Sequence, residues 1–131
     1  YPYAMTTVHV ESVGGAFAQN IVVRHHRVVC DEGTGVGGSD SGPDPTELLL
    51  GALGACVAMT VKMYAGRKGW ETGSIQVDLT GRDEQGTFIV ERRLTFAAPL
   101  TDEQRGRLTE IAGKCPVSRR LTGTVEIRAV S

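Results

Sequence analysis

Aromatic residues are scarce in this chain of 131 residues, which has one Trp, three Tyr and three Phe. Charge of either sign is not in excess, because 14 basic side chains face 15 acidic ones. The basic residues are dispersed apart from short pairs such as Arg92-Arg93 and Arg119-Arg120. A basic stripe with interleaved aromatics, which is typical of nucleic-acid binding, is therefore missing. We expect no nucleic-acid partner.

Membrane and secretion signals are also missing from the sequence. Tyr1–Ser12 contains no basic segment followed by an apolar one, so we predict no secretory leader. The apolar run Leu48–Val61 holds 14 residues, whereas a bilayer span needs about 20. The chain has three cysteines, an odd number that does not indicate a disulfide framework. We expect a cytoplasmic protein with no membrane segment.

The length predicts a single domain, residues 1–131, with room for one hydrophobic core. Tyr1–Ala4 precedes Met5, and we interpret these first residues as an expression remnant ahead of the native start. The 17 glycines indicate close backbone packing and several tight turns.

The first third of the chain is predicted to form strands and a loop. Val8–Glu11 alternates apolar and polar residues, and Ile21–Cys30 is rich in β-branched residues. Gly14-Gly15 predicts a turn between these two strands. The segment Gly33–Pro43 holds five glycines among eleven residues, without the Gly-Lys-Ser/Thr of a P-loop. We interpret it as a flexible connector.

The strongest helix signal covers Pro45–Lys68. Asp44 is a good N-cap, Pro45 suits the first helical position, and Glu47 completes a capping box. Gly66 and Gly69 indicate where the helix ends. Its middle is apolar on all sides, which predicts burial on most faces.

The second half of the chain predicts a hairpin, a helix and a last strand. Ile75–Thr80 and Phe88–Phe96 are the two strands, with a turn over Arg82–Gly86. Thr101 opens a helix that carries an apolar face to Cys115, and Thr124–Ala129 alternates again. The resulting order, β-β-α-β-β-α-β, fits an α+β domain.

Two of the thiols, Cys56 and Cys115, lie one in each predicted helix. Such a pair either packs in the core or forms a redox couple, and spacing alone does not decide between them. Cys30, on a β-branched strand, is interpreted as core packing. The cysteines are far apart in sequence and His25 and His26 are adjacent on a predicted strand, so we expect no metal and no cofactor.

The local sequence around each of these two thiols resembles motifs of a known protein family. The stretches GPDPTELLLGALGAC and KCPVSRRLTGTVEI resemble the OsmC/Ohr family of hydroperoxide-reducing proteins. In that family a Pro-x-Glu helix start leads through small residues to the first Cys, and the second Cys stands in a Cys-Pro-x-Ser-like segment. The likeness extends from about Asp31 to the end of the chain.

The resemblance implies an α+β fold with long central helices packed on curved antiparallel sheets, in an intertwined homodimer. It implies that Cys56 attacks an organic hydroperoxide, becomes a sulfenic acid and is closed to a disulfide by Cys115. The expected reductant is a small dithiol or a lipoyl-bearing protein. The expected biological role is an antioxidant stress response.

Two departures place the chain nearer a divergent OsmC-like branch. The family's N-terminal Arg has no counterpart, because no Lys or Arg precedes Arg24. The family's Glu stands ten residues before the Cys, where this chain has Thr46, while Glu47 stands nine before. Glu47 is therefore either a cap or catalytic support for Cys56. The candidate substitute cations that could stabilise a thiolate are Arg24, Arg27, Arg92 and Arg119.

Two functions from different classes follow. The first is a cysteine-dependent peroxidase that uses Cys56 and Cys115, with Glu47 in support. The second is an OsmC-like redox-sensing or small apolar ligand-binding module with little peroxidase activity, which the missing N-terminal Arg favours.

Overall fold

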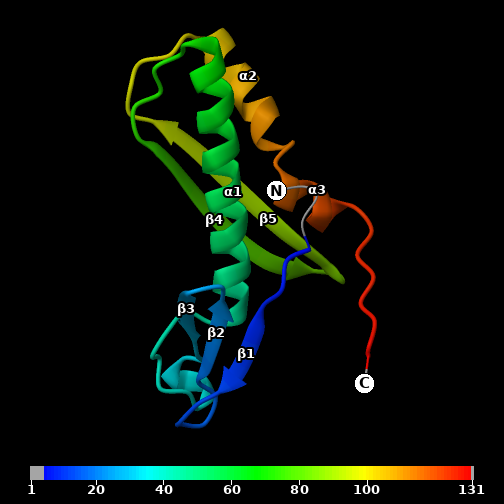
Figure 1. Cartoon of the computed structure of the whole chain (residues 1–131). Helices are drawn as coiled ribbons and strands as arrows, with labels where there is room; N and C mark the ends of the chain where they lie inside the picture. Colours follow the sequence, from blue (N-terminus) through cyan, green and yellow to red (C-terminus); the bar gives the residue numbers. More distant parts are fainter. Residues whose placement is uncertain (1–4, 131) are drawn as a thin grey trace. The chain divides into compact units, whose positions relative to one another are not determined.

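A computed structural model of the chain describes residues 5–130, so the interpretation of residues 1–4 as a remnant lies outside the described part. Contacts group the chain into two compact units, one up to Leu49 and one from Leu50 onward. Helix α1 (Pro45–Lys68) begins in the first unit and continues through the second (Figure 1). Each unit is described below by itself.

The N-terminal unit contains an antiparallel sheet in the order β1-β2-β3. Its strands are β1 (His9–Ser12), β2 (Gln19–Val23) and β3 (His26–Cys30). The prediction of one long strand over Ile21–Cys30 is wrong, because the chain turns back between β2 and β3.

Arg24 explains why this turn was missed. Its φ of 52° lies in the left-handed region, which Gly, Asn or Asp usually occupy. Because Arg is not a typical turn residue, the sequence does not indicate a turn here. His25 therefore lies in the turn and His26 starts β3, and their ring centroids are 4.0 Å apart. The prediction that the two histidines share one strand and point to opposite faces is wrong.

The glycine-rich segment after β3 is held in place by Asp31, which is 2% exposed. The Asp31 carboxylate accepts hydrogen bonds from the N–H groups of Glu32, Ser39 and Ser41 at 2.8, 3.2 and 3.1 Å. It also accepts one from the Ser41 hydroxyl at 2.7 Å. The segment, which includes the 3₁₀ turn Thr34–Val36, is thus tied to one buried side chain and is not a flexible connector.

Helix α1 begins and ends where the sequence predicts. The Asp44 carboxylate accepts the Glu47 N–H, and the Glu47 carboxylate accepts the Asp44 N–H, each at 2.8 Å, which is a capping box. At the other end Gly69 has φ 72° and its N–H donates to the Gly66 carbonyl at 3.2 Å. This left-handed glycine stops the helix.

The C-terminal unit contains a hairpin of β4 (Ile75–Glu84) and β5 (Thr87–Phe96). Both strands are longer than predicted, because only Gln85 and Gly86 form the turn, with φ of 49° and 84°. Positive φ at both positions matches the two-residue turns that fit strand twist. Along β4 half-buried and exposed residues alternate from Ile75 to Arg82, as predicted.

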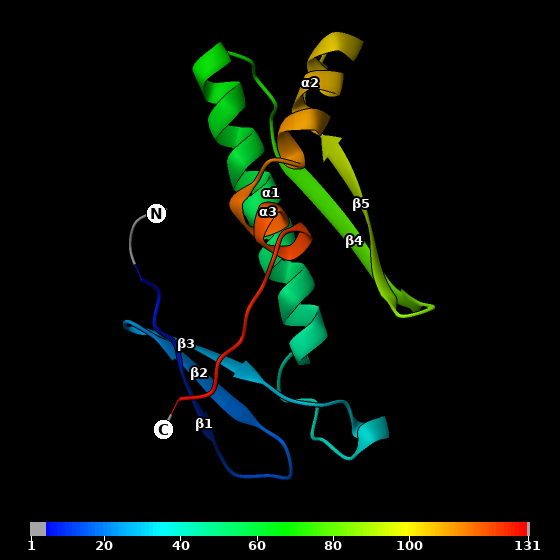
Figure 2. The same cartoon turned by 90° about the vertical axis from the view of Figure 1, so that its right-hand side faces the viewer.

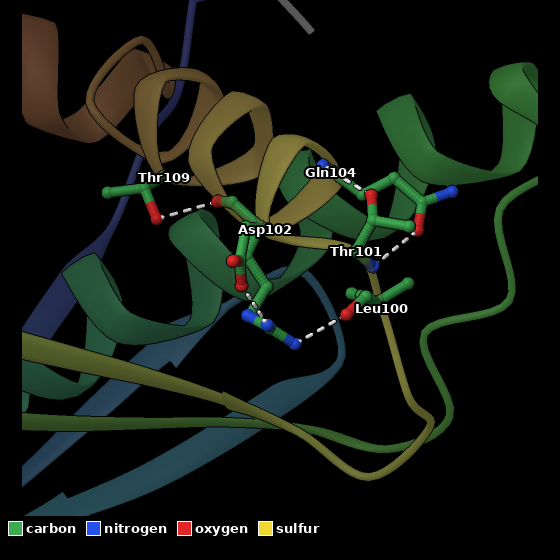
Figure 3. Close-up of polar contacts among 6 residues, drawn as sticks. Leu100, Thr101, Asp102, Gln104 and Thr109 are labelled. Atoms are coloured by element: carbon green, nitrogen blue, oxygen red, sulfur yellow. Dashed lines mark hydrogen bonds and ion pairs between the residues drawn. The ribbon is translucent and has the colours of Figure 1, made fainter.

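Helix α2 (Asp102–Ala112) starts with a second capping box, drawn in Figure 3. The Gln104 N–H donates to the Thr101 hydroxyl at 3.0 Å, and the Gln104 side chain accepts the Thr101 N–H at 2.9 Å. The helix ends at Ala112, and a short helix α3 (Pro116–Thr122) follows. The predicted second helix continued to Cys115, and α3 was not predicted.

The core of the C-terminal unit lies between α1, α2 and one face of the hairpin (Figure 1, Figure 2). Val57 and Val61 of α1 and Leu108 and Ala112 of α2 are all fully buried. Gly54 lets the hairpin approach α1, because a Cβ placed there would lie 2.6 Å from Cδ1 of Leu79. The glycine thus faces a side chain of the hairpin.

The described chain does not cover all of α1. Met59 and Met63 are 61% and 57% exposed, so burial on most faces is not reached within the described chain. Residues of α2, the hairpin and, through Val117, α3 pack in one cluster with α1. By length and composition alone α1 could also cross a membrane, although 33% of its most apolar window is buried within the chain.

The predicted last strand, Thr124–Ala129, is not formed. Residues 124–130 have no regular secondary structure, and Val125 and Ile127 are 61% and 91% exposed. Alternation specifies which side chains share a face, but a strand also needs a neighbouring edge for its backbone hydrogen bonds. That edge is not supplied to residues 124–130 within the described chain.

Replacing Asp31 with Asn should destabilise the protein at neutral pH, because the buried acceptor of four hydrogen bonds loses its charge. These hydrogen bonds, that of the Ser41 hydroxyl first, lower the pKa of Asp31. The carboxylate therefore contributes stability above the unfolded pKa of about 3.9, and loses it as pH falls through the lower native value.

Urea unfolding of wild type and Asp31→Asn at pH 7 and at pH 3 measures this effect. The difference in free energy of unfolding should shrink at the lower pH. Asp40→Asn is the matched control, since Asp40 is exposed in the same segment and Asn tolerates its φ of 53°. An equal loss in both variants would contradict the role given to Asp31.

Gly54→Ala should destabilise the protein even though Ala is the better helix former. The added methyl group meets Leu79, so the hairpin or its side chain has to move. Gly66→Ala is the control on the same helix, because nothing lies within 4 Å of a Cβ there. We expect Gly66→Ala to stabilise by about 0.5–1 kcal/mol. Thermal unfolding that shows the same sign for both variants would refute this packing.

Candidate active site

Two of the three thiols meet in the core of the C-terminal unit. Cys56 lies on the buried side of α1 and is 6% exposed, while Cys115 lies directly before α3 and is fully buried. Both belong to the same buried cluster, and Cys56 is close enough to raise the pKa of the Cys115 thiol. All three cysteines of the chain are present as thiols. Residues remote along the chain are thus brought into direct contact.

Apolar side chains surround this thiol pair. Both cysteines belong to one buried cluster that also contains aliphatic residues of α1 and α2. Its other buried members are Leu53, Val57, Val61, Ala65, Leu108 and Ala112. Such surroundings favour an apolar substrate and disfavour charge on either sulfur.

The local structure around Cys115 follows from Pro116. Proline suits the first position of a helix, so Pro116 starts α3 and Cys115 becomes its N-cap. The Cys115 sulfur accepts the Ser118 N–H at 3.3 Å. The Cys-Pro-x-Ser segment contained this signal, because a capping side chain followed by Pro predicts a helix start. From the sequence, Pro116 was interpreted only as the end of the preceding helix.

Burial raises the pKa of the Cys115 thiol. The hydrogen bond with Cys56 and its negative charge raise this pKa further, while the N–H groups of Ser118 and Val117 lower it. A Cys115 that keeps its proton can donate it in a hydrogen bond to a Cys56 thiolate. The surroundings of Cys115 therefore favour its neutral thiol.

Glu47 and Cys30 belong to the N-terminal unit. Glu47 belongs to the N-terminal unit, where its carboxylate accepts the Asp44 N–H of the capping box. Cys30 is 5% exposed at the end of β3, in the same unit. Burial first, then the nearby Asp44 carboxylate, raises the pKa of Cys30. Packing is the role that these contacts support for Cys30.

Among the four candidate cations, Arg92 lies close to the segment that precedes Cys115. A Cβ placed at Gly113, two residues before Cys115, would lie 3.7 Å from Nη2 of Arg92. No carboxylate of residues 5–130 forms an ion pair with this guanidinium. Arg119 lies one turn into α3, while Arg24 and Arg27 belong to the N-terminal unit.

Metal-ligating side chains do not gather in the described part of the chain. Among residues 5–130 no group of three His, Cys, Asp or Glu could hold a metal ion. The chemistry available at the site is therefore that of the thiols and their hydrogen bonds.

Solved structures of low sequence identity share this fold. An OsmC-like protein from Mycoplasma pneumoniae has a TM-score of 0.79 at 15% identity, covering 92% of this chain and 89% of that one. A putative osmotic stress induced and detoxification response protein from Psychrobacter arcticus has a TM-score of 0.77 at 20% identity, covering 88% of each chain. An organic hydroperoxide resistance protein from Elizabethkingia anophelis has a TM-score of 0.67 at 22% identity, covering 95% and 94%.

A search of curated proteins finds no match to the chain. The family described as OsmC-like protein matches residues 38–129, which is more than half of the sequence and includes both thiols of the buried pair. The α+β architecture with antiparallel sheets agrees with the OsmC-like structures. The chain therefore belongs to the family of OsmC-like proteins.

Proposed function

We propose that this chain is a thiol-dependent peroxidase that reduces organic hydroperoxides with Cys56 and Cys115. The observation that carries the proposal is the burial of the two thiols together in one apolar cluster. Family membership supports a peroxide-related role, since the family includes organic hydroperoxide resistance proteins. The expected setting is the cytoplasm, as part of a stress response.

The chemistry proceeds in two steps. The Cys56 thiolate attacks a peroxide oxygen, so that an S–O bond forms, the O–O bond breaks and the alcohol leaves after taking up a proton. The Cys115 thiol then attacks the sulfenic sulfur, so that an S–S bond forms and water leaves with the Cys115 proton. A dithiol or a lipoyl-bearing protein returns both cysteines to thiols by exchange.

Substrate preference follows from the surroundings of the pair. Each methylene of an alkyl peroxide that enters the apolar cluster contributes about 0.8 kcal/mol, whereas hydrogen peroxide contributes none. The exposed side of α1, with Met59 and Met63, supports a homodimer in which a second copy covers this helix. Burial of that side would also explain why the most apolar helix of the chain is only partly covered here.

The first test measures turnover of cumene hydroperoxide with dihydrolipoamide as reductant. Cys56→Ser should abolish turnover, and Cys115→Ser should stop the cycle at a sulfenic acid that dimedone traps on Cys56. Cys30→Ser is the matched control and should retain activity, because Cys30 lies in the other unit. After one equivalent of peroxide, mass spectrometry of wild type should find a Cys56–Cys115 disulfide. Full activity of Cys56→Ser would end the proposal.

Arg92→Ala should slow the reaction of Cys56 at neutral pH, because a cation near the pair favours the thiolate. Arg93→Ala is the control, since Arg93 precedes Leu94 and lies opposite Asp78 on the other side of the hairpin. We expect about a tenfold slower iodoacetamide reaction at Cys56 for Arg92→Ala, equivalent to about one unit of pKa. The Cys56 peptide is quantified by mass spectrometry. Equal rates in both variants would remove Arg92 from the mechanism.

The second candidate function is a redox-sensing or apolar ligand-binding module. The full burial of Cys115 and its raised pKa favour this candidate, because a protonated resolving thiol reacts slowly. A disulfide that forms with peroxide but is not turned over by dithiols would support the sensor over the enzyme.

A further inference from the structure

A hollow of about 450 Å³ lies in the C-terminal unit between the end of α1 and α2. Figure 2 shows these two helix segments side by side. Tyr64 and Lys68 of α1, and Trp70 just after it, line the hollow together with Gly106 and Arg107 of α2. The volume falls within the range of about 300–1,000 Å³ that small-molecule sites have. The thiol pair does not line it.

Tyr64 is the centre of this hollow. Its hydroxyl accepts a hydrogen bond from Nε of Arg107 at 2.9 Å, and the guanidinium carbon lies 5.3 Å from the ring centroid. The Lys68 ammonium lies 5.7 Å from the same centroid. Trp70 packs edge-on, with ring centroids 6.0 Å apart at 67°. The Tyr64 ring therefore lies against two cations, and Trp70 packs beside it.

Donor groups of these cations are available to a ligand. Lys68 forms no ion pair with a carboxylate of residues 5–130, and Arg107 forms one, through Nη1 to Glu110 at 3.2 Å. Both partners of that pair are well exposed, so the pair is weak. The hydrogen bond from Arg107 lowers the pKa of Tyr64.

Gly106 keeps the hollow open. It lies inside α2, where glycine is the poorest helix former after proline, and its φ is not in the left-handed region. A Cβ placed there would meet nothing within 4 Å. Neither backbone conformation nor packing within the chain therefore requires glycine at this position. A larger side chain would enter the hollow that Gly106 lines.

We propose that this hollow binds a small organic monocarboxylate with a flat apolar body, such as an aryl carboxylate. Arg107 and Lys68 supply donors for the carboxylate, and the Trp70 ring contacts the flat body. Glu103 and Glu110 also line the hollow and repel a second negative charge. A cationic ligand is disfavoured, because the two cations already occupy the neighbourhood of the Tyr64 ring.

Trp70, the one Trp of the chain, makes the site directly observable. Benzoate added to the full chain should change the Trp70 fluorescence in a saturable way. Benzamide, which has the same shape without the charge, should bind about tenfold more weakly or less, because a charge-assisted hydrogen bond is lost. Benzylamine, the cationic counterpart, should give no saturable change. Saturation-transfer NMR on benzoate provides a second reading independent of the fluorophore.

Variants locate the binding. Arg107→Gln should weaken benzoate binding about tenfold, and Gly106→Leu should abolish it by filling the hollow. Arg105→Gln is the matched control on α2, because Arg105 instead contacts Asp102 and the Leu100 carbonyl. Circular dichroism checks that each variant is folded. Equal binding of benzoate and benzamide, or equal effects of Arg105→Gln and Arg107→Gln, would overturn the proposal, as would no saturable signal by either method.

Discussion

The packing of α2 and the hairpin onto one side of α1 is the constraint on which the C-terminal unit depends. Val57, Val61 and Leu108 are fully buried there, and Gly54 sets how closely the hairpin approaches. The thiol contact is a consequence of this packing, because Cys56 is held on α1 and Cys115 on the segment that follows α2. A change that separates these helices would therefore affect stability and the thiol pair together.

Burial of the thiol pair has opposite consequences for substrate binding and for thiol ionisation. It provides the apolar surroundings that suit an alkyl peroxide, and it also raises the pKa of Cys115. Hydrogen bonds from Ser118 and Val117 offset part of this effect, because Cys115 caps α3.

Several elements could be predicted from local sequence. Asp44, Pro45 and Gly69 fix the ends of α1, since caps act within one turn of the helix. The turn at Arg24 and the start of α3 could not be predicted in the same way. Arg24 is a residue type that seldom turns a chain, and Pro116 signals both an end and a start.

By itself, the sequence determined helix α1, the β4–β5 hairpin and the family, because these depend on caps, periodicity and short motifs. Tertiary structure decided which groups meet. Contact of Cys56 with Cys115, and of Tyr64 with Arg107, joins residues remote along the chain. Exposure of Met59 and of residues 124–130 was likewise set by which neighbours the fold supplies. Such contacts depend on packing between elements, which local pattern does not encode.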